Sequence, residues 1–190
     1  LEKRITTCGR PFTGVEARII DPETGKEQVN GEKGLIEISG PSVFKGYLND
    51  PEKTKETISK DGWLSTGDFG SLSEDGFISY HGRLKDMLKV GGENVAALEI
   101  ESFYNNHDGV LLSQVVGIDD ERLGEVAALF VERKEGSNIS AEKLINSAKG
   151  KISNFKIPRY VVFIDDWPMS STKVQKFKLK DYDLGEKVFG

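Results

Sequence analysis

The pattern of apolar residues changes near Asp86, and this change constrains the fold more than any other feature of the 190-residue sequence. Before it, residues 1–82 alternate short strand patterns with turn signals. From residue 87 onward, helical and strand patterns alternate, which is typical of a separate α+β unit. We therefore predict an α+β chain with two domains: a β-rich segment, residues 1–85, and a small α+β domain, residues 86–190.

The first part is predicted to hold three strands and one helix. Strands are expected at residues 15–19, 35–39 and 77–81, and the opening residues are also strand-like. Residues 21–25, Asp-Pro-Glu-Thr-Gly, have turn chemistry and predict a hairpin. Asp50 precedes Pro51, and this pair favours a helix start because aspartate caps free N–H groups and proline lacks one.

The second part is predicted to alternate helices with strands. Ile100, Phe103 and Tyr104 lie at helical spacing, and the polar residues 105–109 end that helix. Ser140 is placed to cap a second helix. Strands rich in β-branched and aliphatic residues are expected at 110–118, 126–133 and 160–164.

The composition of the chain argues against several classes of binding partner. A formal net charge of -5 argues against a protein that binds nucleic acid or an anionic membrane, because those surfaces attract basic proteins. One cysteine, Cys8, cannot form an internal disulfide, and two histidines are too few for a Cys/His zinc site. No apolar run approaches the roughly 20 residues of a membrane helix. We expect a cytoplasmic protein with small-molecule partners, and a chain opening at Leu1 rather than Met suggests a piece of a longer one.

Three segments carry candidate chemistry, and the first is Ser65-Thr66-Gly67-Asp68, which we expect in a tight turn after Trp63. A carboxylate held in such a turn can accept two hydrogen bonds from neighbouring ribose hydroxyls. The alternative is that Asp68 only forms the turn.

The second and third segments carry basic residues. In residues 82–95, an expected strand end delivers Arg83, and the pair Gly91-Gly92 lets the backbone approach a ligand closely. The alternative is a domain linker with a β-turn. In residues 170–179, a polar loop presents Lys173 just before an amphipathic end segment. Its alternative is a solvated surface charge.

Taken together and in this order, these segments closely resemble the adenylate-forming family of acyl-CoA synthetases, luciferases and peptide-synthetase adenylation domains. The resemblance covers nearly the whole chain, and it has more parts than any single motif. Further matching stretches are Gly40-Pro41-Ser42-Val43, Gly46-Tyr47, Pro51-Glu52, Asp61-Gly62-Trp63 and Asn154-Phe155-Lys156-Ile157-Pro158-Arg159.

The resemblance implies roles for the nucleotide. In that family the matching aspartate and arginine hold the ribose of AMP, which gives this role to Asp68 and Arg83. The loop lysine, Lys173, would lie between the α-phosphate of ATP and the attacking carboxylate, where it counters charge that grows in the transition state. Asp86 matches the hinge residue, so residues 86–190 would be a mobile lid on the last subdomain of a large AMP-binding domain.

It also implies roles for coenzyme A. Lys89 matches a second lysine of this region, and Gly91 and Gly92 lie where the pantetheine arm passes. Phe155 would stack near the adenine, with Lys156 or Arg159 near phosphates. Residues 149–180 hold eight Lys or Arg against two Asp, which agrees with phosphate binding, although a basic solvated face remains the alternative.

The implied function is a ligase that forms acyl-AMP from a carboxylic acid and ATP, then acyl-CoA with release of AMP, as in fatty acid metabolism. The implied partners are the acid, ATP and CoA, with Mg²⁺ bound through a missing N-terminal part and a homodimer left open. Nothing here resembles the family's phosphate loop or acyl pocket, so we expect this piece alone to be inactive. Alternatives are a scaffold module that keeps the fold without turnover and an adenylation domain that loads a carrier protein.

Overall fold

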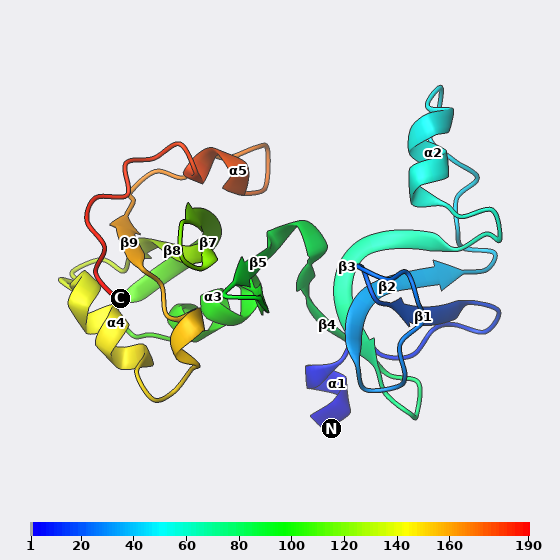
Figure 1. The fold of residues 1–190 in the computed structure, drawn as a ribbon, viewed down its shortest axis with the longest axis horizontal. Helices are drawn as coiled ribbons and strands as arrows, with labels where there is room; N and C mark the ends of the chain where they lie inside the picture. Colours follow the sequence, from blue (N-terminus) through cyan, green and yellow to red (C-terminus); the bar gives the residue numbers. More distant parts are fainter. Residues whose placement is uncertain (1) are drawn as a thin grey trace. The chain divides into compact units, whose positions relative to one another are not determined.

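The computed structural model describes residues 2–190, and the chain divides into two compact units (Figure 1). The first unit ends at Lys85 and the second is Asp86–Gly190. Helices are combined with sheets that are mainly antiparallel, and this confirms the predicted α+β class. Among residues 2–190, no helix is long and apolar enough to span a membrane.

The first unit is built on a four-stranded antiparallel sheet in the order β1-β2-β3-β4. Its elements are helix α1 (Glu2–Thr6), strands β1 (Glu16–Ile20) and β2 (Lys33–Ser39), helix α2 (Pro51–Thr57), and strands β3 (Leu64–Leu72) and β4 (Ile78–Arg83). The predicted strands correspond to β1, β2 and β4. Among residues 2–85, four apolar side chains form the buried core: Ile19, Ile20, Ile36 and Phe69.

Two predictions about helices in the first unit had different outcomes. The helix start at Asp50-Pro51 is confirmed, since the Asp50 carboxylate accepts a hydrogen bond from the Lys53 N–H at 2.9 Å and Pro51 is the first helical residue. The strand-like interpretation of the opening residues was wrong, because Glu2–Thr6 is the helix α1. Glutamate, lysine and arginine are good helix formers, and their propensity prevails in this short segment.

The second unit begins at the last residue of a 3₁₀ turn, η1 (Leu84–Asp86). Its elements are strands β5 (Met87–Val90) and β6 (Glu93–Ala96), helix α3 (Ala97–Asn105), strands β7 (Val110–Asp120) and β8 (Gly124–Arg133), helix α4 (Ala141–Ala148), the 3₁₀ turn η2 (Asn154–Lys156), strand β9 (Tyr160–Phe163) and helix α5 (Lys176–Leu179). The sheet has the order β6-β5-β8-β7, and β9 adds to β8 in parallel.

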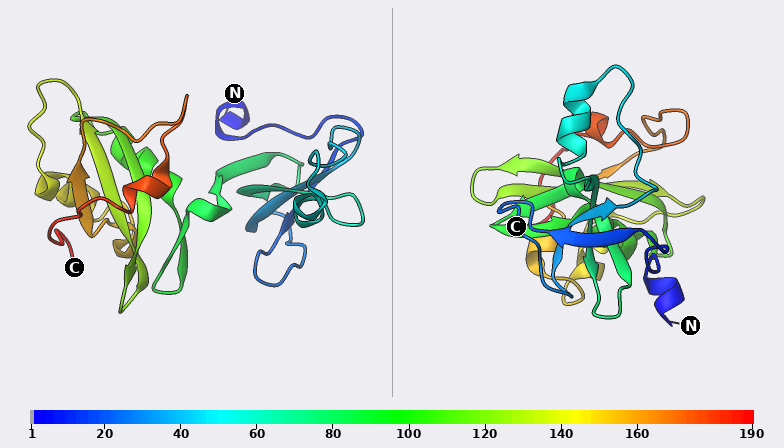
Figure 2. Two further views of the ribbon diagram at one scale, coloured as in Figure 1. Left: turned by 90° about the horizontal axis from the view of Figure 1, so that it is seen from above. Right: turned by 90° about the vertical axis from the view of Figure 1, so that its right-hand side faces the viewer.

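Strand β8 separates two apolar clusters because its side chains alternate between the faces of the sheet. Leu129 and Val131 join the cluster that contains the buried residues of α3 and α4. Ala128 and Phe130 face the opposite side, where Leu179 of α5 is fully buried. Figure 1 shows α4 and α5 on opposite sides of the β7–β8 hairpin, and the left view of Figure 2 shows α5 lying across it.

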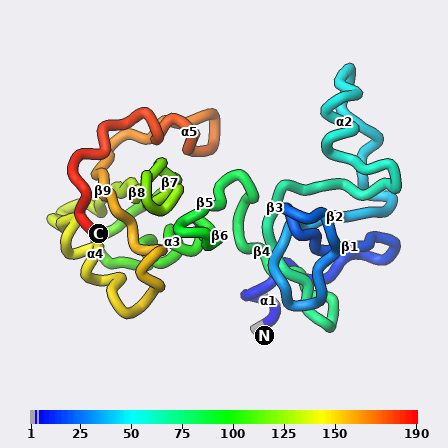
Figure 3. The backbone as a smooth tube through the Cα atoms, in the orientation of Figure 1, coloured from blue at the N-terminus to red at the C-terminus, as the bar shows by residue number. Residues whose placement is uncertain are grey.

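The predicted helices of the second unit are confirmed as α3 and α4. Ile100 and Tyr104 are buried on α3, and Leu144 is buried on α4. The Ser140 hydroxyl accepts a hydrogen bond from the Lys143 N–H at 3.3 Å, as a capping residue does. The β5–β6 hairpin, whose strands run side by side in Figure 3, was not predicted, because four-residue strands carry little periodic signal.

Candidate functional site

The Thr-Gly-Asp stretch lies inside β3 and not in a tight turn. Thr66, Gly67 and Asp68 stand opposite the single residue Ile36 of β2, so they form a bulge in the ladder. Gly67 has a φ of 73°, a left-handed conformation that glycine adopts without strain. The Thr66 hydroxyl donates to the Ile36 carbonyl at 2.8 Å and accepts from the Asp68 N–H at 3.0 Å. The prediction of a tight turn was therefore wrong. A β-bulge within β3 sets the direction of the Asp68 side chain instead.

Asp68 and Arg83 are brought together by the register of the sheet. They are direct partners across β3 and β4, and Arg83 Nε lies 2.8 Å from Asp68 Oδ1. Asp68 Oδ1 is buried and accepts no aligned hydrogen bond, so this contact is an ion pair. The aspartate side chain keeps 30% of its surface exposed, and that exposure lies away from Oδ1. The exposed surface of Asp68 is therefore on the other atoms of its side chain.

The glycine pair forms the turn of the β5–β6 hairpin. Val90 pairs with Glu93, so Gly91 and Gly92 are the two turn residues, with φ of 60° and 88°. Positive φ at both positions is what a type I′ turn requires, and this gives both glycines a structural reason. A β-carbon at Gly92 would meet no atom within 4 Å, so the outer side of this turn is open.

The other predicted residues of this region lie near the hairpin in sequence. Asp86 is the half-buried last residue of η1 and the first residue of the second unit. Lys89 is exposed on β5, and its backbone N–H donates to Glu125 Oε2 at 2.7 Å.

The three residues assigned to the adenine and phosphates of coenzyme A all have partners within the second unit. Phe155 is partly buried against the apolar cluster that contains the buried residues of α3 and α4. Lys156 Nζ lies 2.6 Å from Glu99 Oε1. The Arg159 guanidinium carbon lies 4.7 Å from the centre of the Phe189 ring. A phosphate would therefore have to compete with Glu99 for Lys156, whereas the stacked Arg159 keeps its charge available.

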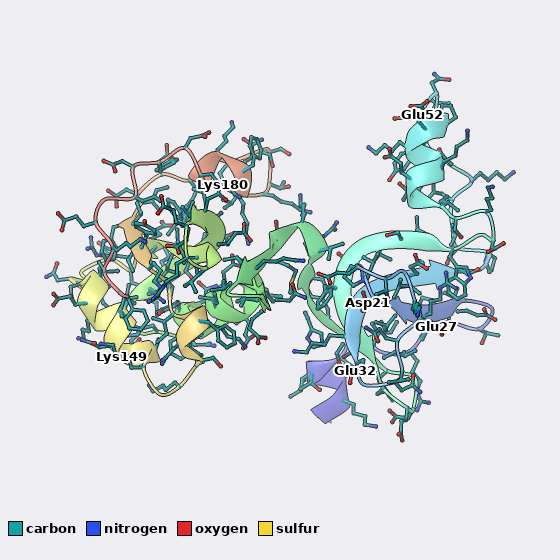
Figure 4. The ribbon with its side chains drawn as sticks, viewed as in Figure 1. Asp21, Glu27, Glu32, Glu52, Lys149 and Lys180 are labelled. Carbon is teal, nitrogen blue, oxygen red and sulfur yellow. The ribbon has the colours of Figure 1, made fainter. Side chains whose placement is uncertain are left out.

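The basic residues of 149–180 do not form one patch. Figure 4 shows Lys149 at the end of α4 and Lys180 just beyond α5, at well separated places on the second unit. The charge excess of this stretch is therefore spread over more than one face.

A hollow of about 330 Å³ beside Arg159 was not predicted from the sequence. Its lining combines the β7–β8 turn with residues near the end of the chain: Asp119, Asp120, Glu121, Arg122, Leu123, Arg159, Lys187 and Gly190. Lys187 Nζ donates to Asp120 Oδ2 at 2.8 Å, and this bond lowers the pKa of Asp120 to about 2 and raises the pKa of Lys187. No local pattern predicts this pair, because its members are 67 positions apart.

Lys173 lies at the end of an exposed loop. An isolated bridge between Met169 and Val174 closes the loop, and Ser170 and Lys173 bond to each other through three contacts of 2.8 to 3.3 Å. The Lys173 side chain is exposed and makes no hydrogen bond, ion pair or ring contact with the other side chains that the structure describes. It is thus available to a ligand.

The sequence did not predict a role for two further charged residues, Glu101 on α3 and Lys176 on α5. Glu101 is 5% exposed, although a glutamate on a surface helix ordinarily faces water. The ammonium of Lys176 donates to its Oε1. Within residues 2–190, no group of three or more His, Cys, Asp or Glu side chains is arranged to hold a metal ion.

Comparison with known proteins supplies the family. Residues 1–48 match the model of the AMP-binding enzyme, and residues 99–174 match the model of the AMP-binding enzyme C-terminal domain. The chain belongs to the AMP-binding, or adenylate-forming, enzyme family. Its sequence is 44% identical over 180 residues to the putative acyl-CoA synthetase YngI of Bacillus subtilis (strain 168), covering 94% of this chain and 33% of that protein.

Solved structures of AMP-binding enzymes agree. ATP-bound MatB from Rhodopseudomonas palustris is 41% identical, with a TM-score of 0.85 over 93% of this chain and 35% of that one. Apo MatB has the same identity and coverage but a TM-score of 0.67. The o-succinylbenzoate CoA synthetase MenE of Bacillus subtilis, in complex with the acyl-adenylate OSB-AMP, is 30% identical, with a TM-score of 0.88 over 97% of this chain and 37% of that one. The chain thus spans about a third of the length of these relatives.

Proposed function

We propose that the full-length protein is an ATP-dependent acyl-CoA synthetase. The carboxylate of an acid attacks the α-phosphate of ATP, and pyrophosphate leaves to give acyl-AMP. The thiol of CoA, after losing its proton, then attacks the acyl carbonyl, and AMP leaves. The observation that carries the proposal is the Asp68–Arg83 pair, held by a bulge and by strand register in a chain of the AMP-binding family.

Asp68 and Arg83 form the proposed ribose site. A carboxylate on a partly exposed side chain can accept hydrogen bonds from two neighbouring hydroxyls, and the ion pair with Arg83 holds the carboxylate in one orientation. Both steps use the AMP moiety, so this site serves both half-reactions.

Lys173 is the proposed catalytic residue of the first step. Its exposed ammonium has no internal partner among residues 2–190, so it can approach the α-phosphate and the attacking carboxylate. Negative charge grows there in the transition state, and a fixed positive group stabilises it.

The second step is assigned to other parts of the second unit. The open side of the Gly91-Gly92 turn suits close passage of the pantetheine arm, with Lys89 nearby on β5. Phe155, Lys156 and Arg159 are proposed to hold the adenine and phosphates of CoA.

Use of two different surfaces requires the second unit to reorient, with Asp86 as the pivot. The two MatB structures support this, because the ATP-bound form superposes more closely on this chain than the apo form does. The mobile lid, the Mg²⁺ bound outside this chain, the cytoplasmic location and the possible homodimer belong to the same proposal.

The direct test uses the purified full-length protein and a panel of carboxylic acids. We expect acid-dependent exchange of labelled pyrophosphate into ATP without CoA, and acid-dependent AMP release when CoA is added. Exchange without AMP release on CoA, but with release on a carrier protein, would replace CoA by that carrier as acceptor. Absence of exchange with every acid would favour the scaffold alternative and contradict the proposal. The 190-residue chain alone is expected to catalyse no exchange.

A further inference from the structure

Glu101 is a buried carboxylate with an uncommon set of partners. Its side chain is 6% exposed, and Oε1 accepts both the Val115 N–H at 2.7 Å and the ammonium of Lys176. Burying a charge is unfavourable unless it is paired and hydrogen-bonded, so this arrangement satisfies a strict requirement. Glu101 and its two partners come from α3, β7 and α5, which places Glu101 at a junction of these elements.

The bond to Val115 does not explain the negative charge. Strand β7 pairs with β8 on one side only, so its outward N–H groups need other acceptors. Asn105, one helical turn after Glu101, accepts the Ser113 N–H at 2.7 Å, and a neutral amide suffices there. Four residues of helix rise about 6 Å and two residues of strand about 6.8 Å, so the two acceptors match two successive outward groups. A glutamine could cap Val115 in the same way, so the charge of Glu101 serves Lys176.

Lys176 holds one arm of the loop that carries Lys173. It follows Lys173 by three residues, and its side chain is 22% exposed. The other arm is held at Trp167, whose Nε1 donates to Glu132 Oε2 at 2.6 Å. Between the two anchors, residues 169–173 are exposed. The place from which the Lys173 side chain extends is therefore limited by two anchored arms and a short exposed tip.

We propose that the buried Glu101–Lys176 ion pair is a positioning device that fixes the loop bearing Lys173 for adenylate formation. This inference rests on the proposed role of Lys173 in the first step. Glu101 and Lys176 are positioning residues, since they act through the loop and need not touch a substrate. A displacement of a catalytic group by about 1 Å can reduce a rate by about 100-fold, so a loosened arm has a measurable effect.

The kinetic test compares Lys176→Met, Lys176→Arg and Glu101→Gln in the full-length protein. We expect Lys176→Met to lower kcat for pyrophosphate exchange by about 10- to 100-fold, with little change in KM for ATP and in thioester formation from supplied acyl-AMP. Glu101→Gln keeps an acceptor for Val115 and should show the same pattern. Lys176→Arg keeps the charge and should recover most of the rate. Lys143→Met, at an exposed position of α4, is the matched control and should behave like the parent.

A second readout does not depend on activity. In the 190-residue chain, ¹⁵N relaxation of the backbone amides at 171–173 reports the order of the loop. We expect the order parameters to fall in Lys176→Met from near 0.85 toward values below about 0.6, and to recover in Lys176→Arg.

The two readouts separate the possible outcomes. An unchanged loop order in Lys176→Met would overturn the inference, even if the rate falls, because Lys176 would then act directly. A lower melting temperature with an unchanged exchange rate and loop order would make the pair merely stabilising and would also overturn it. If the parent protein shows no exchange at all, the proposed function fails, while the relaxation data still decide whether the pair orders the loop.

Discussion

The two units of the chain differ sharply in how much apolar surface they bury. In residues 2–85, four apolar side chains are buried, whereas in residues 86–190 there are 23. The first unit also exposes large apolar side chains, among them Phe12 at 85% and Leu48 at 91%. The second unit has helices or chain segments packed on both faces of its sheet.

From this difference we infer which unit is stable without a partner. Hydrophobic burial is the main favourable term in folding, and a small domain with a thin core is marginal. The second unit has the core of an independent domain. The first unit has the sheet and the Asp68–Arg83 pair but little core beneath them. We infer that its exposed apolar residues need a partner surface for full stability.

The largest expected effect comes from separating the units. Residues 86–190 expressed alone should unfold in one cooperative transition, because their core is complete. Residues 2–85 alone should show no cooperative transition, because four buried side chains cannot balance the chain entropy of about 85 residues. Thermal unfolding followed by circular dichroism measures both. A sharp transition in the first piece would show that its sheet needs no partner.

The next effect separates the chemistry of the two units. Lys173→Ala in the full-length protein should slow adenylation by about 100- to 1,000-fold and leave thioester formation from supplied acyl-AMP much less affected. Asp68→Ala should slow both half-reactions, because the AMP moiety must be bound in each of them. Single-turnover assays of each step make the comparison. Equal losses in both steps for Lys173→Ala would mean that this lysine has another use.

A smaller effect is expected at the boundary between the units. Asp86→Pro fixes φ near -65° and restricts Lys85 before it. If the second unit must reorient at this residue, adenylation should persist while thioester formation slows, by about 100-fold if the thiol is displaced by about 1 Å. Circular dichroism should first show that the variant is folded. Parental rates in both steps would exclude Asp86 as the pivot.

The smallest effect concerns the core of the second unit. Tyr104 is fully buried, its hydroxyl accepts or donates no hydrogen bond within residues 2–190, and burial raises its pKa well above 10. The folded state thus keeps a proton that the unfolded state loses above about pH 10, so stability falls as pH rises beyond that value. Tyr104→Phe should remove this part of the alkaline loss and change stability at pH 7 by about 1 kcal/mol or less. Urea unfolding of both proteins at pH 7 and pH 10.5 tests this. An identical pH dependence in the two would contradict it.

Particular residues show why some elements could be predicted and others not. The caps at Asp50 and Ser140 act on N–H groups three residues away, so the starts of α2 and α4 could be predicted from the sequence. The bulge at residues 66–68 could not, because it depends on the strand that lies opposite. The parallel pairing of β9 with β8 likewise depends on packing between distant segments.

Local patterns in the sequence were enough to predict the α+β class, most helix and strand positions, and, through its ordered motifs, the family. Three features depend instead on the folded chain: Asp68 and Arg83 are cross-strand partners, Lys156 and Arg159 have internal partners, and Glu101 is buried against Lys176. The cause is the separation along the chain between the residues that interact. Helical periodicity and caps act between residues three or four positions apart, whereas the Glu101–Lys176 pair joins residues 75 positions apart, which meet only when sheet and helices have packed.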